Sequence, residues 1–407
     1  MKILFLTLID IESIDDRGIY QDLLRDFIKK NHQVFVVSPY ERKIKKKTTL
    51  LIDKVDNVSI LKVKTFNIQK TNILEKGLGT IAIEYQYLNA IKKYFSKEKF
   101  DIIVYSTPPI TFYKVIKYIK NRDCAISYLL LKDIFPQNAV DLGLMNKKNV
   151  VYKIFRKKEI KLYEISDYIG CMSEANRKHI LTHNPFVNPS KIEVNPNSIE
   201  INNKSFLTDS EKTKTRELYN LPTHKKIFVY GGNLGKPQGL DFLLEIIQFE
   251  EKNENVFFLI IGGGTEFTRI QKWFDTFQPA NAKLIGYQPK QIFDTIVASC
   301  DVGMIFLNPN FTIPNFPSRL LSYLEFGLPV MAATDMASDV GDALEINNCG
   351  YKVISGDLGN FHGKIEILSS DDKLVSKMQK NARALLLKNY NVGISTSLII
   401  DKLKQQV

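Results

Sequence analysis

Short runs of apolar residues alternate with amphipathic helical segments along the whole 407-residue chain. In the first half, the runs predict strands at 2–7, 33–38, 59–63, 102–106, 125–131 and 168–172. In the second half, they predict strands at 226–230, 256–261, 282–285, 302–307, 330–333 and 351–354. Continuous apolar runs separated by helices are typical of parallel sheets with crossover helices, so the pattern predicts two doubly wound α/β units.

A polar stretch at 195–209 separates the two series of predicted strands. We therefore predict an N-terminal domain of residues 1–200 and a C-terminal domain of residues 201–390. A chain of this length, 44% hydrophobic, is long enough for each domain to have its own core.

The net charge of +12 lies entirely in the first 200 residues, which hold 34 Lys and Arg against 22 Asp and Glu. The remaining residues hold 22 of each. Two interpretations stay open: the lysines are simply solvated, or they attract an anionic membrane leaflet. No nucleic-acid-binding motif accompanies them, so a nucleic-acid partner is not expected.

Other features exclude several classes of protein. The four cysteines have no C-x-x-C spacing, which favours buried thiols over disulfides or zinc ligands. The five histidines are dispersed and no D-x-D triplet occurs, so no metal site is predicted. The first apolar run is too short to span a bilayer and Asp10 and Glu12 follow it, so we expect a cytoplasmic protein without a signal sequence.

The segment 315–320 reads Asn-Phe-Pro-Ser-Arg-Leu and predicts a loop that turns into the start of a helix. A helix start offers free backbone N–H groups and the positive end of a dipole. Ser318 adds a hydroxyl group and Arg319 adds a permanent cation. This combination is suited to a phosphate or diphosphate, although an ordinary capped helix with an exposed arginine would have the same sequence.

Two glycine-rich turns follow predicted strands of the second half. The first, after 226–230, contains Gly231, Gly232 and Asn233, with Lys236 as a nearby cation. The second, at 262–264, lacks the G-x-G-x-x-G spacing, so dinucleotide binding is not expected there. Each turn is either a ligand contact or an ordinary tight turn beside a sheet.

In the first half, Arg17 and Gly18 lie in the loop after the first predicted strand, and Asp133 follows the strand at 125–131. Arg17 is a candidate for neutralising a phosphate, and Asp133 is a candidate general base. The alternative for Asp133 is a turn or helix-capping aspartate, and Glu174 is a weaker candidate that is equally explained by a helix dipole.

The motifs resemble, in content and order, those of retaining family 4 glycosyltransferases that use nucleotide sugars. The match rests on the Pro-Ser-Arg-Leu segment at 317–320, on Lys-Asp-Ile-Phe-Pro-Gln at 132–137, and on the glycine-rich segment 230–240. It is nearest to the bacterial branch that builds O-antigen and capsule repeat units, including N-acetyl-L-fucosamine transferases. The resemblance implies a GT-B fold: two facing Rossmann-like domains with an interdomain cleft, and a last helix within 391–407 that returns to the first domain.

The resemblance also implies an activity. The enzyme would transfer an N-acetylated deoxyhexose, such as N-acetyl-L-fucosamine, from a UDP-sugar to a lipid-diphosphate-linked saccharide, with retention. It would work at the inner face of the cell membrane, without a cofactor or a metal, and the linker at 195–209 would allow the two domains to close.

Site residues follow from the same resemblance. Three are candidates for the reaction itself: Asp133, Lys236 and Arg319. The others are candidates for binding the donor: Arg17, Gly18, Gly232, Asn233, Gly263, Tyr287, Pro317, Ser318, Leu320 and Ser322.

The chain departs from the family pattern at four positions. The two glutamates that are usual in the family fall at Pro314 and Ser322, and a usual Arg and Lys fall at Asn233 and Gln238. Glu325 or backbone groups at 312–316 are possible substitutes in reading the sugar. Two other functions therefore stay open: a GT-B sugar-nucleotide epimerase and a non-catalytic nucleotide-sugar-binding scaffold.

Overall fold

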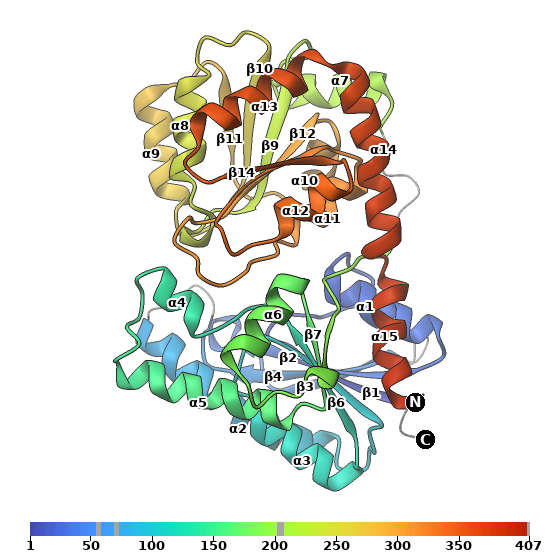
Figure 1. Ribbon diagram of the computed structural model, residues 1–407. Helices are drawn as coiled ribbons and strands as arrows, with labels where there is room; N and C mark the ends of the chain where they lie inside the picture. The colour runs from blue at the N-terminus through green and yellow to red at the C-terminus, as the bar shows by residue number, and fades with distance from the viewer. Residues whose placement is uncertain (54–57, 69–72, 202–206, 405–407) are drawn as a thin grey trace. The chain divides into compact units, whose positions relative to one another are not determined.

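The computed structural model describes residues 1–53, 58–68, 73–201 and 207–404, so residues 202–206 of the predicted linker lie outside the described residues (Figure 1). The chain forms two compact units. The first contains Met1–Glu200 and Val392–Val407, and the second contains Ile201–Asn391.

The first unit is built on a sheet with the strand order β3-β4-β2-β1-β5-β6-β7-β8. Its strands are β1 (Lys2–Leu6), β2 (Gln33–Glu41), β3 (Thr49–Asp53), β4 (Val58–Thr65), β5 (Ile102–Ser106), β6 (Ile126–Leu131), β7 (Tyr168–Cys171) and β8 (Ile192–Val194). All neighbouring strands are parallel except β3 and β4, which pair antiparallel. The edge strands β3 and β8 were not predicted: β3 has three apolar residues, Leu50, Leu51 and Ile52, between polar neighbours, and β8 has three residues in all.

The helices of the first unit are α1 (Ile19–Lys29), α2 (Ile73–Tyr94), α3 (Tyr113–Asp123), α4 (Gln137–Asp141), α5 (Val150–Ile165), α6 (Glu174–His183) and α15 (Val392–Lys404), with 3₁₀ turns η1 (Arg42–Ile44) and η2 (Pro189–Lys191). Figure 1 shows the last helix, α15, beside α1.

Helix α15 completes the core of the first unit. Its residues Val392, Ile399 and Ile400 belong to the same buried cluster as Phe5 of β1 and Phe27 of α1. Because these side chains come from both ends of the chain, the first unit is complete only when α15 is in place.

A chain of buried hydrogen bonds also holds α15. The Ser395 hydroxyl donates to Asn195 Oδ1 over 2.6 Å, and Asn195 Nδ2 donates to the Tyr128 hydroxyl over 2.9 Å. That hydroxyl in turn donates to Glu193 over 2.7 Å. The chain links α15 to β6 and to the end of β8, so the polar groups at this interface are paired.

The second unit has a fully parallel sheet with the order β11-β10-β9-β12-β13-β14. Its strands are β9 (Lys226–Asn233), β10 (Val256–Gly263), β11 (Ala282–Ile285), β12 (Val302–Phe306), β13 (Val330–Thr334) and β14 (Gly350–Ile354). Numbered within the unit, this order is that of the dinucleotide-binding doubly wound sheet, which reverses between β9 and β12. The predicted class, parallel α/β in both halves, is confirmed.

The helices of the second unit are α7 (Asp209–Leu218), α8 (Asp241–Phe249), α9 (Phe267–Phe277), α10 (Lys290–Ala298), α11 (Arg319–Glu325), α12 (Val340–Ile346), α13 (Leu358–Ser370) and α14 (Asp372–Asn389), with a 3₁₀ turn η3 (Lys236–Gln238).

Tyr323 of α11 fills the place where β9 and β12 separate. The two strands are paired at Phe228 and Val229 only, and Tyr323 is fully buried just beyond this pairing. Its hydroxyl accepts from the Gly231 N–H over 2.9 Å and lies within donating distance of the carbonyls of Val229 (3.2 Å) and Met304 (3.1 Å). One hydroxyl group thus bridges both strands and fixes α11 against them.

Gly303 of β12 makes room for this ring. A Cβ atom at position 303 would collide with the ring of Tyr323. A larger residue there would displace either the ring or the strand, so glycine is required by packing at this position.

We predict that Tyr323→Phe lowers the free energy of unfolding of the second unit by about 1–3 kcal/mol, because the Gly231 N–H is left buried without a partner. Urea unfolding followed by fluorescence reports on this unit, since Trp273 of α9 is the single tryptophan of the chain. The control is Tyr351→Phe in β14. An unchanged midpoint in Tyr323→Phe would contradict the role assigned to the hydroxyl.

Candidate active site

Arg319 is the centre of the candidate site in the second unit. The carbon of its guanidinium group lies 4.3 Å from the centroid of the Tyr230 ring, and its Nη2 donates to Gln238 Oε1 over 3.1 Å. Burial raises the pKa of Tyr230, and the charge of Arg319 partly offsets this rise. Over the described ranges of the chain, Arg319 forms no ion pair, and its buried Nη1 has no hydrogen-bond partner of suitable geometry. Among the residues that the structure describes, no carboxylate serves as a counter-ion for this fixed cation.

Arg319 and Tyr323 lie four residues apart on α11, and therefore on the same face of the helix. Tyr323 is fixed between β9 and β12, so Arg319 lies one turn closer to the carboxyl ends of these strands. This is the strand switch, where doubly wound sheets bind ligands.

Each glycine near Arg319 is explained by a different local contact. Gly232 has a positive φ of 119°, and a Cβ atom there would lie 4.0 Å from the guanidinium carbon of Arg319. Gly262 has a φ of 153°, and a Cβ atom there would collide with the carbonyl of Gly232. The close approach of β9 and β10 is therefore sufficient reason for glycine at position 262, and no ligand contact is needed to explain it. Gly263 lies beside Tyr287, since its Cβ would be 3.6 Å from the Cβ of that tyrosine, whose side chain is 79% exposed.

Lys236 supplies a second cation near the strand switch. It begins η3, and its carbonyl accepts from Asn308 Nδ2 over 3.1 Å, just after β12. The Asn308 N–H donates to the carbonyl of Pro237 over 2.9 Å. The loop after β9 is therefore tied to the chain after β12. The Lys236 side chain is exposed, and so is Asn233, the last residue of β9.

The start of α11 offers fewer free backbone N–H groups than the sequence suggested. The helix has seven residues, and the Leu320 N–H already donates to the carbonyl of Pro317 over 3.2 Å. The side chain of Leu320 is fully buried, so only its backbone could meet a ligand. Pro317, Ser318 and Ser322 are half-buried. The guanidinium group of Arg319, rather than a row of free N–H groups, is therefore the candidate contact for an anion here.

Glu325, considered above as a substitute for the family's glutamates, is only 1% exposed. It lies in the helix that packs on α14, and its carbonyl accepts from Arg383 Nη1 over 3.1 Å. Burial in this position argues against a role in reading the sugar.

Asp335 and Ser338, which the sequence analysis missed, hold the loop before α11. The Asp335 carboxylate accepts from the backbone and the hydroxyl of Ser338, each over 2.8 Å, and the Ser338 hydroxyl accepts from the Asn315 N–H over 2.9 Å. Burial raises the pKa of Asp335, and these hydrogen bonds oppose the rise. The signal was present as Asp-x-x-Ser directly after the strand at 330–333.

In the first unit, Arg17 and Gly18 lie in the loop between β1 and α1. Arg17 Nη2 donates to the carbonyl of Glu200 over 3.2 Å. Gly18 has a φ of 179°, which any residue can adopt, and its N–H lies 3.4 Å from Asp22 Oδ1. The buried Asp22 carboxylate also accepts from the Glu200 N–H over 2.9 Å. These hydrogen bonds attach the loop between β1 and α1 to Glu200, the last residue of the segment Met1–Glu200.

Asp133 follows β6. Both of its carboxylate oxygens accept from Asn138 Nδ2, over 2.8 and 2.9 Å, and its N–H donates to the Thr107 hydroxyl over 3.1 Å. These contacts organise the loop after β6 and are what a turn aspartate would make. Its role as a base stays a prediction.

Lys132 is a second residue that the sequence analysis did not single out. Its Nζ donates to the carbonyl of Asn195 over 3.0 Å, at the end of β8. Burial lowers the pKa of Lys132 to about 7. An apolar run that ends in Lys, as at 129–132, was the available signal.

Comparison with known proteins identifies the second unit. The family model described as "Glycosyl transferases group 1" matches residues 211–385. The second unit carries a glycosyl transferases group 1 domain. All of the candidate residues from Gly232 to Ser322 lie within it.

Two curated relatives of this chain are also glycosyltransferases by name. The probable glycosyltransferase WbjE of Pseudomonas aeruginosa is 23% identical over 331 residues, which are 80% of this chain and 79% of that protein. The putative colanic acid biosynthesis glycosyl transferase WcaI of Escherichia coli K12 is 26% identical over 177 residues, 43% of this chain and 41% of that protein.

Among solved structures, Anabaena HepE in complex with UDP has a TM-score of 0.72 at 14% identity and covers 100% of both chains. The likeness confirms the predicted fold class, GT-B, with two Rossmann-like domains.

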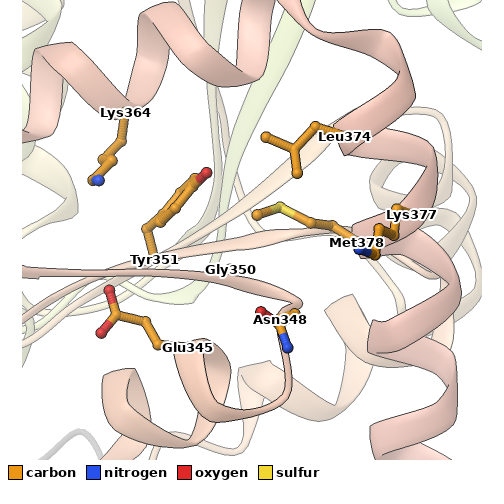
Figure 2. A pocket seen from close by; sticks show the side chains of 8 residues that line it. All are labelled: Glu345, Asn348, Gly350, Tyr351, Lys364, Leu374, Lys377 and Met378. Atoms are coloured by element: carbon orange, nitrogen blue, oxygen red, sulfur yellow. The ribbon is translucent and has the colours of Figure 1, made fainter.

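A cavity of about 310 Å³ in the glycosyl transferases group 1 domain lies elsewhere (Figure 2). It is lined by Gly350 and Tyr351 at the amino end of β14 and by side chains of α13 and α14, with Lys364 Nζ 4.5 Å from the centroid of the Tyr351 ring. Ligands of doubly wound sheets bind at the carboxyl ends of the strands, so this cavity is not the candidate donor site.

One histidine pair corrects the view that the histidines are dispersed, and one further cluster combines a histidine with two glutamates. His179 and His183 stack on α6 with ring centroids 4.0 Å apart, and burial lowers the pKa of His179 to about 4. Glu250, His362 and Glu366 have ligand-type atoms within 4.8 Å of one another. His362 Nδ1 already lies 2.6 Å from Glu250 Oε1, and Asn253 bridges the two glutamates, so hydrogen bonds account for the cluster. The absence of a metal from the mechanism stays a prediction.

Within residues 1–53, 58–68, 73–201 and 207–404, no helix is both long enough and apolar enough to cross a bilayer.

We predict that replacing Lys132 with methionine changes how stability depends on pH. Below about pH 7, the folded and unfolded states both hold the Lys132 proton. Between about 7 and 10.5, the unfolded chain holds one proton more, so the stability of the native protein rises with pH relative to Lys132→Met. The relative slope is at most about 1.4 kcal/mol per pH unit.

Urea unfolding at a series of pH values measures this difference, with circular dichroism as the probe. Lys178→Met, an exposed lysine of the same unit, is the control for the loss of one cation. If the difference between native protein and Lys132→Met is the same at pH 6 and at pH 9, the lysine is not desolvated as described.

Proposed function

We propose that this protein is a retaining glycosyltransferase that moves a sugar from a UDP-sugar to a lipid-diphosphate-linked saccharide, in the biosynthesis of a surface polysaccharide. The observation that carries the proposal is the fixed guanidinium of Arg319 at the strand switch of the second unit, without an ion-pair partner among the residues described. Arg319 is half-buried, and leaving its shielded Nη1 without a hydrogen bond costs free energy that an anionic ligand would recover.

Arg319 and Lys236 would stabilise the diphosphate as the bond to the sugar breaks. Negative charge grows on the leaving group during this step, and a cation already in position needs no reorganisation. Tyr230 and Gln238 hold the guanidinium group in place on two sides. Gln238, which stands where the family usually has a cation, would act here by positioning Arg319.

The donor class is supported by several observations. The solved structure of Anabaena HepE contains UDP. The exposed ring of Tyr287, beside Gly263, offers a surface on which a uracil base could stack. We propose an N-acetylated deoxyhexose such as N-acetyl-L-fucosamine as the sugar, on the resemblance described above. The name of WcaI, a putative colanic acid biosynthesis glycosyl transferase, supports a role in polysaccharide synthesis.

On the acceptor side, we propose Asp133 as the group nearest the reacting hydroxyl, with Arg17 and Gly18 beside the transferring phosphate. The lipid-linked acceptor would place the enzyme at the inner face of the cell membrane, and the excess of 12 positive charges in the first 200 residues supports this location.

We predict that UDP raises the melting temperature of the native protein in a saturable way, and that GDP, CDP, ADP and NAD do not. Arg319→Ala should weaken UDP binding about 10- to 100-fold, the loss expected for a charge-assisted hydrogen bond. Thermal shift measurements over a UDP titration give both results. The control is Arg269→Ala, since Arg269 is an arginine of the same unit that pairs with Asp241 and Glu266.

Each other outcome has a defined meaning. A melting-temperature shift with GDP instead of UDP would support the nucleotide-binding site but contradict UDP-sugar as the donor. UDP binding without release of UDP from any UDP-sugar in the presence of lipid-linked acceptors favours the non-catalytic scaffold. No shift with any nucleotide contradicts the proposed function.

A further inference from the structure

The outer face of helix α5 and the loop before it combine exposed aliphatic side chains with a dense positive charge. Four exposed aliphatic residues lie within eleven positions of the chain: Leu144 (61% exposed), Val150 (67%), Val151 (45%) and Ile154 (45%). Five exposed lysines surround them: Lys147, Lys148, Lys153, Lys157 and Lys161. We call these nine residues the α5 outer face.

The inner side of α5 is firmly anchored, so the exposed residues are not a loosely packed core. Phe155 packs edge-on against Phe135 with ring centroids 5.1 Å apart, and Leu162 and Tyr163 are buried. Asn149 caps the helix by accepting from the Val151 N–H over 3.0 Å. The helix therefore presents its outer face in a fixed orientation.

Positive charge outweighs negative charge on this face. Residues 142–165 contain seven Lys and Arg against two acidic residues, Glu159 and the exposed Glu164. Glu159 points inward, is buried, and pairs with Arg156 over 2.6 Å. As far as the structure describes the chain, none of the five lysines of the α5 outer face forms an ion pair.

We propose that the α5 outer face docks on an anionic lipid leaflet. Aliphatic side chains beside lysines fit such a surface, because the aliphatic groups enter the acyl boundary while the long lysine side chains reach the phosphate headgroups. A second copy of the chain fits less well, since a symmetric contact would bring the lysines of both copies together. Nucleic acid would use the charge but leave the aliphatic groups in water.

This inference deepens the proposed function, because it names the surface by which the enzyme would reach a lipid-linked acceptor. It does not depend on which sugar is transferred. The full chain is tested by co-sedimentation with vesicles of phosphatidylcholine alone and with vesicles of equal parts phosphatidylcholine and phosphatidylglycerol.

Native protein should bind the anionic vesicles and not the neutral ones. The triple variant Lys147→Glu, Lys148→Glu, Lys153→Glu should lose more than about 100-fold in affinity, from about fivefold for each cation removed. The triple variant Val150→Ser, Val151→Ser, Ile154→Ser should lose the part of the binding that persists at high salt.

Matched controls lie on other exposed surfaces. Lys45→Glu with Lys47→Glu changes exposed lysines of the first unit, and Met336→Ser with Ile346→Ser changes exposed apolar residues of the second. Both controls should bind as the native protein does.

The proposal is overturned if native protein ignores anionic vesicles, if both patch variants still bind, or if the controls lose binding equally. Loss of self-association in the aliphatic variant, measured by light scattering without vesicles, would assign the face to a second copy instead. The UDP-induced thermal shift is measured on the same variants and should be unchanged. A native protein that binds vesicles but no nucleotide would reject the proposed function and leave this inference standing.

Discussion

The hydroxyl of Tyr323 is the contact on which the arrangement of the second unit depends. A doubly wound sheet must separate its strands at the switch point, and the backbone groups exposed there need partners. In this protein one phenol supplies them for both strands: it accepts from Gly231 and donates toward Val229 or Met304. Since Tyr323 belongs to α11, these hydrogen bonds also fix the position of α11 relative to β9 and β12. Arg319 is placed by this contact, and Tyr230 and Gln238 then fix its orientation.

The two units differ in how much positive charge they carry and in how that charge is arranged. The second unit, residues 201–391, holds 20 Lys and Arg against 21 Asp and Glu, and its cations near the strand switch are few and individually positioned. The first unit holds 36 Lys and Arg against 23 Asp and Glu, and on α5 that positive charge is spread over long lysine side chains beside aliphatic groups. Fixed guanidinium geometry suits one small, highly charged ligand, whereas mobile ammonium groups suit a broad surface of headgroups. The form of the cation in each unit therefore matches the size of the anion it would meet.

Sequence periodicity was sufficient for the α/β class, because every strand predicted from an apolar run is present. It missed β3 and β8, because their apolar residues are few: Leu50, Leu51 and Ile52 in β3, and Ile192 and Val194 in β8. For the site, the sequence drew attention to Arg319 and the glycine-rich turns but not to their supports. Gln238 was considered only as a missing cation, and Asp335 and Ser338 were not considered, because a positioning role depends on which segments meet in space. The burial of Glu325 could not be predicted from the sequence of α11 alone. It results from packing against α14, which follows more than forty residues later.

The path of the chain sets the order in which its cores can be completed. The first unit is made of Met1–Glu200 and Val392–Val407, so the whole second unit is an insertion within it. Val392, Ile399 and Ile400 belong to the core of the first unit, yet they leave the ribosome after the whole of the second unit. The N-terminal domain of most multidomain proteins folds first during synthesis. Here the second unit has all its residues available before the first unit does, because the core formed by the first two hundred residues stays incomplete until α15 is synthesised.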